Sequence, residues 1–401
     1  MCSSDLDNAY IPRIACPVLW LSPANDFHAH IDHMAWNWRN LPDDRLRFSI
    51  APHLNHRHTD EHAITQLLWF EQHLKGAFAM PKTPRLILDL RTPDGVPTLT
   101  VTPDASMPVR RVDLHYAVDP HELTRFWRDA PAVQDGGSWR AACPVLSPDQ
   151  PLFAYANVVY DTPPQYRKVA HAPGQDDTDT FALSSRVLSA APAALRAAGV
   201  KATDAPERLI DDGARGWRDW YLVNWDHPPL WRAATRKLRD PKWRGPDGAR
   251  LAFEIRCETD NTLVVTFNCN AWGACQPGKP AVDYAVVREL KGSPDWQTVS
   301  VGLADLVAAD PSVTAPLANW QTVTEFSLSP SGTVVRDGTK VKIDGRPWRG
   351  PREIRSLRWV GGAYAAAPAT AAALNPGDHA QNFNEAIRKS IEIEKQDAVS
   401  P

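Results

Sequence analysis

The sequence lacks the features that would place it in several broad classes of protein. It contains no uninterrupted run of about 18 apolar residues, so it predicts no membrane-spanning helix. Its 44 basic and 47 acidic residues give a formal net charge of −3 without a basic block, so a nucleic-acid partner has no electrostatic support. No internal repeat of fixed period is present. With 43% apolar and 23% charged residues, the composition excludes a disordered chain, a collagen and a coiled coil.

Cysteine is scarce, with six residues among 401 and no Cys-x-x-Cys pair. Cys269 and Cys275 flank a short Asn-Ala-Trp-Gly-Ala segment and could close a disulfide loop in an oxidising compartment. A pair of buried reduced thiols is the equally well supported alternative. Cysteine spacing therefore says little about the fold or the compartment.

Two residue types are present in excess, with 16 tryptophans and 13 histidines. Eight histidines lie in the first 80 residues: His28, His30, His33, His53, His56, His58, His62 and His73. The length itself predicts two to three domains, at roughly 150 residues per domain.

Residues 14–76 alternate between strand and helix patterns and predict a βαβα unit. Strands are expected at 17–21 and 45–50, and helices at 28–40 and from Thr59 or Asp60 through Leu74, before Gly76. The second helix is expected to bury Ile64, Leu67, Leu68 and Leu74. Since parallel sheets are normally covered on both sides, two parallel strands with one crossover are expected to leave their faces and one edge open.

Beyond residue 80 the sequence changes to short strands separated by prolines and turns. Strands at 86–90, 98–102, 109–116 and 153–159 predict an antiparallel sandwich of the immunoglobulin or fibronectin type. Alternation from Trp217 to Trp359 predicts a second sandwich, resembling a jelly roll. The expected fold is multidomain, a partial α/β unit followed by two mainly-β sandwiches. The boundaries are 7–80 for the α/β unit, 81–166 for the first sandwich, 167–210 for a linker with a short helix, 211–362 for the second sandwich and 363–401 for a tail.

The strongest chemical signal is a pair of residues that follow neighbouring strands. Asp26 lies in the loop after the first strand, and His56 lies in the loop after the second. Ligands of open α/β sheets bind beyond the carboxyl ends of the strands, where both residues are expected. An aspartate can orient an imidazole, which then acts as general base for a nucleophile.

The flanking residues carry a family resemblance. Residues 14–26, the Asn-His-Arg-His run at 55–58 and the segment at 68–76 resemble the C-terminal end of an α/β-hydrolase. The resemblance is to dienelactone hydrolase or acetyl xylan esterase-like enzymes and to PhoPQ-activated pathogenicity-related proteins. Residues 125–158 are similar to the β-domain that follows the hydrolase in the PhoPQ-type proteins.

The resemblance implies a serine esterase that needs no cofactor and acts on acyl esters, with a polysaccharide ester as the favoured substrate. It implies that Asp26 is the triad acid and His56 the triad base. His53 and His58 are alternatives for the base, and Asp32 is the alternative for the acid. The chain departs from the family because it contains no Gly-x-Ser-x-Gly motif, which carries the nucleophile in α/β-hydrolases.

We therefore expect the nucleophile on an upstream part of the same hydrolase domain, which becomes the implied partner of this chain. Without it, the chain is expected to be inactive. Residues 1–6 lack the features of a signal peptide and resemble the translation of a sequencing adapter, so they are interpreted as an artefact. The full-length protein is expected to be secreted or periplasmic.

Two alternatives use other residues. The sets His28-x-His30-x-x-His33 and His53-x-x-His56-x-His58, with a carboxylate from Asp26 or Asp32, could form a metal-binding hydrolase site. The tryptophan-rich second sandwich could instead be a non-catalytic glycan-binding module, since indole faces stack on sugar rings. The expected surface platforms are Trp217, Trp220, Trp243 and Trp348, and the expected core members are Trp225, Trp272, Trp296, Trp320 and Trp359.

Overall fold

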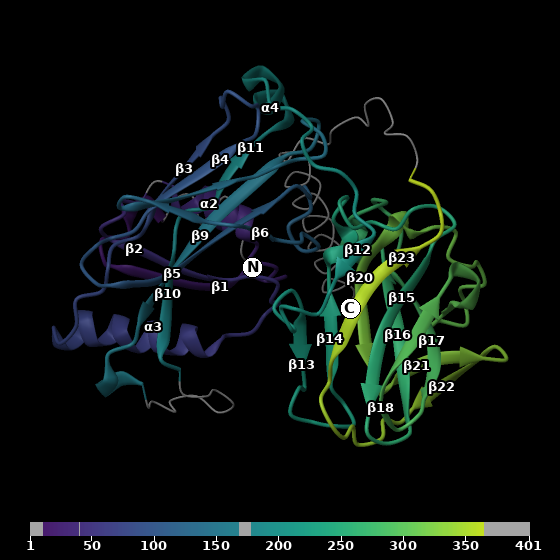
Figure 1. Ribbon diagram of the computed structural model, residues 1–401. Helices are drawn as coiled ribbons and strands as arrows, with labels where there is room; N and C mark the ends of the chain where they lie inside the picture. Colours follow the sequence, from purple (N-terminus) through teal and green to yellow (C-terminus); the bar gives the residue numbers. More distant parts are fainter. Residues whose placement is uncertain (1–10, 40, 168–177, 365–401) are drawn as a thin grey trace, which may run out of the picture.

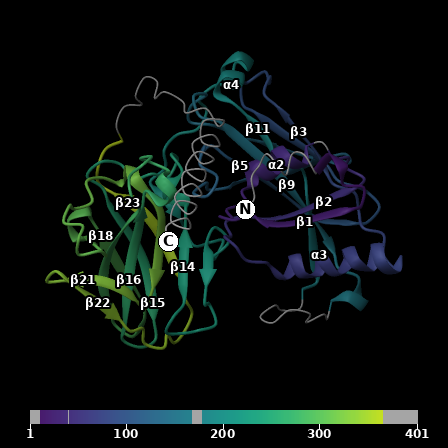
Figure 2. The ribbon, with the colours of Figure 1, turned by 180° about the vertical axis from the view of Figure 1, so that it is seen from behind.

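The computed structural model describes residues 11–39, 41–167 and 178–364, which form two β-rich bodies (Figure 1). The first body contains the N-terminal α/β unit and continues to helix α4 (Pro192–Ala198), and the second is a β-sandwich. Seen from behind in Figure 2, α3 and α4 lie at opposite ends of the first body. None of the helices in the described ranges is long and apolar enough to cross a membrane.

A seven-stranded sheet forms the centre of the first body, in the order β1-β2-β10-β9-β5-β6, with β11 paired to β9. β1 and β2 are parallel, with Val18 opposite Leu46 and Pro23 opposite Ala51, and the other neighbours are antiparallel. The strands are β1 (Val18–Pro23), β2 (Leu46–Ala51), β5 (Val109–Ala117), β6 (Arg128–Ala130), β9 (Leu152–Asp161), β10 (Thr180–Ser184) and β11 (Leu188–Ala190). A four-stranded sheet shares its core: β3 (Arg85–Asp89), β4 (Thr98–Thr102), β7 (Val133–Asp135) and β8 (Ser138–Ala142).

Helices α2 (Ile31–Trp38) and α3 (Asp60–Phe70) cover opposite faces of the parallel pair. Leu19 packs with the core of α3, whereas Val18 and Trp20 pack with that of α2, as side-chain alternation along a strand requires. The expectation that these faces stay open is therefore wrong, and every residue of β2 is buried.

Helix α3 begins as the sequence predicts, because the hydroxyl of Thr59 accepts a hydrogen bond from the backbone N–H of His62 at 3.1 Å. Such a cap stabilises a helix by about 1 kcal/mol. The helix continues as a π-helical turn, η2 (Glu71–Lys75), and ends at Gly76 with φ 65°. Leu74 is 76% exposed, contrary to the prediction, because the wider turn rotates it away from the apolar face.

The predicted boundary between an α/β unit and a separate sandwich is not seen in the sheet. β10 lies between β2 and β9, so the parallel pair and the antiparallel strands form one continuous sheet. The sequence predicts that residues 167–210 are a linker with a short helix. The helix α4 is present there, but the same range also contains the strands β10 and β11. The polar stretch that suggested a linker lies partly at 168–177, outside the described residues. Residues 1–6 and most of the expected tail also lie outside the described residues.

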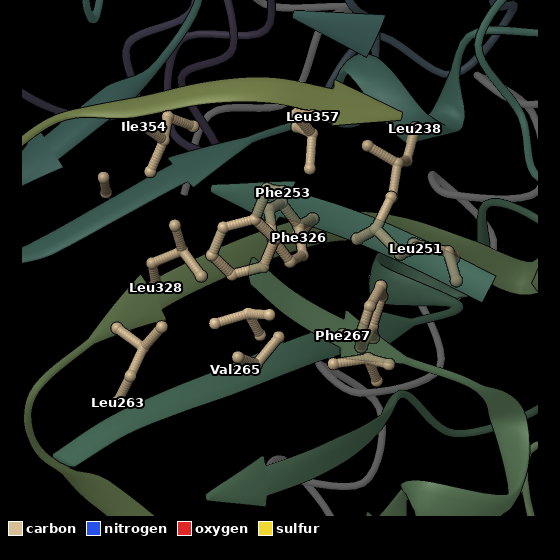
Figure 3. Close-up of a cluster of buried hydrophobic side chains, with 14 of the residues drawn as sticks. Leu238, Leu251, Phe253, Leu263, Val265, Phe267, Phe326, Leu328, Ile354 and Leu357 are labelled. Atoms are coloured by element: carbon tan, nitrogen blue, oxygen red, sulfur yellow. The ribbon is translucent and has the colours of Figure 1, made fainter. Parts of the chain in front are cut away.

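The second body consists of two facing sheets, in the orders β12-β23-β15-β18 and β13-β14-β20-β16-β17-β19, and a β21-β22 hairpin. Phe253, Phe267 and Phe326 interlock between the sheets, with leucines around them (Figure 3). The first sheet contains β12 (Leu209–Asp211), β15 (Arg250–Cys257), β18 (Ser293–Val301) and β23 (Ile354–Val360). The second contains β13 (Tyr221–Val223), β14 (Arg232–Thr235), β16 (Asn261–Cys269), β17 (Val282–Leu290), β19 (Val307–Ala308) and β20 (Val323–Ser329), and the hairpin is β21 (Gly332–Arg336) with β22 (Thr339–Ile343).

Buried ion pairs connect the two bodies. Arg128 of the first body contacts Asp240 of the second through two hydrogen bonds, at 2.8 and 2.5 Å. Arg239 of the second body contacts Asp119 of the first at 2.7 and 3.1 Å. Although burial alone would raise it, the Arg239 guanidinium holds the pKa of Asp119 below its usual range. Directional pairs of this kind fix the orientation of the bodies.

Candidate functional site

The loop after β1 presents the carboxylate of Asp26 in a fixed orientation. One of its oxygens accepts hydrogen bonds from the backbone N–H groups of His28 at 2.7 Å and Ala29 at 3.3 Å. The preceding residue, Asn25, is buried and donates to the carbonyls of Glu122 and Arg125, both at 2.9 Å. The acid loop is thus supported by a loop of the antiparallel part of the same body.

The loop after β2 brings His56 to this carboxylate. The His56 Nδ1 lies 3.1 and 3.3 Å from the two oxygens of Asp26, so Asp26 and His56 meet as the strand-end argument predicts. The Asp26 side chain is only 7% exposed, whereas that of His56 is 56% exposed. With Nδ1 directed to Asp26, Nε2 is the ring nitrogen left for a substrate.

The backbone of the histidine loop is strained at two positions. His53 and His56 have φ values of 62° and 46°. A side chain in this left-handed region costs roughly 1–2 kcal/mol, and such residues cluster at functional sites. Two hydrogen bonds hold the loop in place. The Asn55 side-chain oxygen accepts from the Phe27 N–H at 3.3 Å, and the Asn55 backbone carbonyl accepts from the Tyr221 hydroxyl at 3.1 Å.

The alternative acid and bases lie in other surroundings. His53 is buried, and its ring stacks on Phe126 with centroids 4.7 Å apart. His58 is exposed and lies against His62. Both carboxylate oxygens of Asp32 accept from Arg125, each at 2.8 Å. Of the predicted residues, Asp26 and His56 are therefore the pair with the geometry of an acid–base couple.

The metal alternative gains no support from the arrangement of its residues. Among the described residues, no group of three or more His, Cys, Asp or Glu side chains could hold a metal ion. The His30 ring lies 2.5 Å from Glu122 instead. Although burial alone would lower it, Glu122 raises the pKa of His30, which favours the protonated ring that cannot bind a metal.

Aromatic side chains surround the pair, and the sequence did not indicate them. The Phe27 ring lies 5.1 Å from that of His56, and the His28 ring lies 4.6 Å from it. Trp272 of the second body stacks on Phe27 at 5.9 Å, with an interplanar angle of 17°. Trp272 is 58% exposed, so its prediction as a core residue is wrong.

The predicted glycan platforms require correction. Trp220 and Trp348 are buried at 4% and 5% exposure, because both indoles fill the sandwich core. Trp243 is half-buried beneath the Lys237 ammonium and against Phe126, at the contact between the bodies. Among the expected core members, Trp320 and Trp359 are buried as predicted, and Trp225 and Trp296 are half-buried.

Of the four predicted platforms, Trp217 lines a pocket. An open pocket of about 450 Å³ lies between the loop after β12 and the strands β18 and β23. Its lining includes Trp217, Trp296, Asp212, Glu353 and Arg355. The Trp296 ring is flanked by the guanidinium groups of Arg256 and Arg355, at 4.7 and 4.3 Å. The pocket therefore places two indoles among charged side chains of both signs.

No protein-family model matches the chain, and no curated protein matches it. The functional assignment therefore depends on the geometry of the Asp26–His56 pair and of the Trp217–Trp296 pocket.

Proposed function

We propose that Asp26 and His56 are the acid and base of an ester-hydrolase site of the α/β-hydrolase class. The observation that carries the proposal is the contact of His56 Nδ1 with a carboxylate that two backbone N–H groups hold in place. The position of both residues at the carboxyl ends of parallel strands supports it. The resemblance of residues 14–76 to the C-terminal end of an α/β-hydrolase would make β1, α2, β2 and α3 the closing part of a hydrolase sheet. The strand alternation of the second body favours a jelly roll.

The pair would move one proton in each half of the reaction. Asp26 accepts a hydrogen bond from Nδ1–H, which fixes the tautomer and leaves Nε2 as the base. In the first half, Nε2 takes the proton of a serine hydroxyl as the serine oxygen attacks the ester carbonyl, and gives it to the leaving alcohol. In the second half, Nε2 takes a proton from the water that attacks the acyl-enzyme and returns it to the serine oxygen as the carboxylic acid leaves. In the order typical of this class, the serine precedes the acid and the histidine in sequence, which puts it upstream of the strand that leads to Asp26.

The proposed roles of Asp26 and His56 can be tested in this chain by asking which ring nitrogen of neutral His56 carries the proton. We expect ¹⁵N NMR of the neutral ring to find the proton on Nδ1, because Asp26 accepts it. The Asp26→Ala variant should shift the proton largely to Nε2, the tautomer that a histidine side chain prefers in water. A proton already on Nε2 in the unaltered protein would contradict the proposed role.

Activity tests the same residues in a protein extended in frame by its upstream coding sequence. Hydrolysis of p-nitrophenyl acetate should fall about 10³- to 10⁴-fold in kcat for His56→Gln, and similarly for Asp26→Asn. His58→Gln is the matched control, since His58 is exposed in the same loop and should leave the rate unchanged. An unaltered rate in His56→Gln would refute the assignment.

A second function, glycan binding, is favoured by the pocket of Trp217 and Trp296. The adjacent Asp212, Glu353 and Arg355 could hydrogen-bond sugar hydroxyls while an indole packs on the ring face. Retardation of the chain in a xylan-containing gel should be lost in Trp217→Ala or Trp296→Ala. Trp36→Ala, which removes an exposed indole from α2, should keep it.

A further inference from the structure

An exposed tryptophan of the second body, Trp272, stacks on Phe27, which lies beside His56. Trp272 lies in the loop between β16 and β17 and has φ 58° and ψ 17°, a conformation that bulky side chains rarely adopt. This conformation leaves the indole outside the core of its own sandwich. One face of the ring meets Phe27, and the side chain as a whole remains 58% exposed.

Hydrogen bonds within the loop hold this conformation. The buried Asn270 side chain accepts from the N–H groups of Cys275 at 3.0 Å and Gln276 at 2.8 Å. It also donates to the carbonyls of Gln276 at 3.0 Å and Lys279 at 2.9 Å. Cys269 and Cys275 at the loop ends are free thiols, so these hydrogen bonds, rather than a disulfide, shape the loop.

The loop is also fixed relative to the first body. The Arg239 guanidinium donates to the Ala274 carbonyl at 3.1 Å while it pairs with Asp119. Asp119 belongs to the segment whose carbonyls, at Glu122 and Arg125, hold the side chain of Asn25 beside Asp26. The indole and the acid–base pair are therefore positioned by one connected set of contacts, which favours a preformed site.

We propose that Trp272 is a substrate-binding residue that forms an aromatic wall of the His56 site. Its exposed surface stacks on the apolar face of the sugar ring that carries the ester. The inference rests on the proposed function for its location, but it concerns binding alone. A half-exposed indole at this place offers a large rigid apolar surface at little further conformational cost, because its backbone and one face are already fixed.

Binding of small probes to the full chain tests the role of Trp272 without requiring hydrolysis. The probes are acetylated xylohexaose, unacetylated xylohexaose and methyl ferulate, measured by calorimetry and by ¹⁹F NMR of 5-fluorotryptophan-labelled protein. We expect acetylated xylohexaose to shift the Trp272 resonance, and Trp272→Ala to weaken binding about 3- to 10-fold, as for the loss of one aromatic contact. Trp272→Phe should retain most of the affinity.

Trp36→Ala provides the matched control, since Trp36 is also 58% exposed but contacts Arg39, the residue that follows α2. Equal affinity in Trp272→Ala and unaltered protein would overturn the proposal, as would tight binding of methyl ferulate alone or no binding of any probe. Weakened binding in Trp272→Ala supports the wall even if His56→Gln leaves esterase activity of the extended protein unchanged, so the two proposals fail separately.

Discussion

At the scale of single residues, burial makes two histidines sensitive to acid. His53 and His62 are buried, and this burial lowers their pKa values from 6.5 to about 4 and about 3. In the window between pH 6.5 and these lowered pKa values, the unfolded chain binds protons at the two rings while the folded protein does not. Their contribution to stability is therefore complete above pH 6.5 and is lost as the pH falls through this window.

His53→Asn tests this effect, because asparagine tolerates the left-handed backbone at that position. Between pH 6.5 and 4 the free energy of unfolding should fall less steeply in the variant, by about 1.4 kcal/mol for each pH unit. Urea titrations at several pH values measure the slope. The exposed His58→Asn serves as control, and an identical slope in His53→Asn would show that His53 protonates freely in the folded state.

The pairing of Asp26 with His56 could be predicted from sequence because it follows from local rules. Both residues end neighbouring parallel strands, and the carboxyl ends of such strands share one edge. The stacking of Trp272 on Phe27 could not, because it depends on how two separate bodies meet. A tryptophan next to a strand pattern is usually a core residue, and only its positive φ places it outside.

At the scale of elements, side chains rather than a regular ladder join β2 to the antiparallel strands β10 and β9. β10 pairs with β2 only at Ser184 and Phe48. The Ser184 hydroxyl accepts from the Ile50 N–H at 2.7 Å and donates to Asn157 at 2.5 Å, and Asn157 donates to the Ile50 carbonyl at 2.9 Å. The sequence did not reveal β10, because it is short and follows a polar stretch typical of a linker.

Ser184→Ala should therefore destabilise the first body. The substitution leaves the buried Ile50 N–H and the Asn157 oxygen without this partner, which costs about 1–3 kcal/mol. Urea unfolding followed by circular dichroism measures the loss. Ser189→Ala on the exposed side of β11 is the control, and equal stability of the two variants would mean that water replaces the hydroxyl at Ser184.

At the scale of the whole molecule, buried charges couple the two bodies. Arg128 is 3% exposed and contacts Asp240 and also Asp204, which lies on the approach to the second body. Buried pairs add little over apolar packing, but removal of one partner leaves a desolvated charge and costs about 3–5 kcal/mol. Sequence patterns predicted a β-rich chain of several parts but divided the first body into an α/β unit and a separate sandwich. They did not predict this contact, because charges on separate bodies carry no periodic signal.

Arg128→Met should weaken the contact between the bodies more than the bodies themselves. Calorimetry should find a single unfolding transition split into two, with the first at lower temperature. Arg140→Met removes an exposed partner that lies 3.8 Å from Asp135 and should change stability by less than about 1 kcal/mol. A single unshifted transition in Arg128→Met would indicate that apolar contacts dominate the interface.

The Arg239–Asp119 pair also has a consequence for genetics. Neither residue needs to touch a ligand, yet either substitution can displace the indole of Trp272 relative to His56. A screen for lost recognition would return Arg239 and Asp119 alongside true contact residues. Exchange of the two charges, as in Arg239→Asp with Asp119→Arg, could act as a suppressor. Such second-site rescue would separate a residue that aligns the two bodies from one that binds.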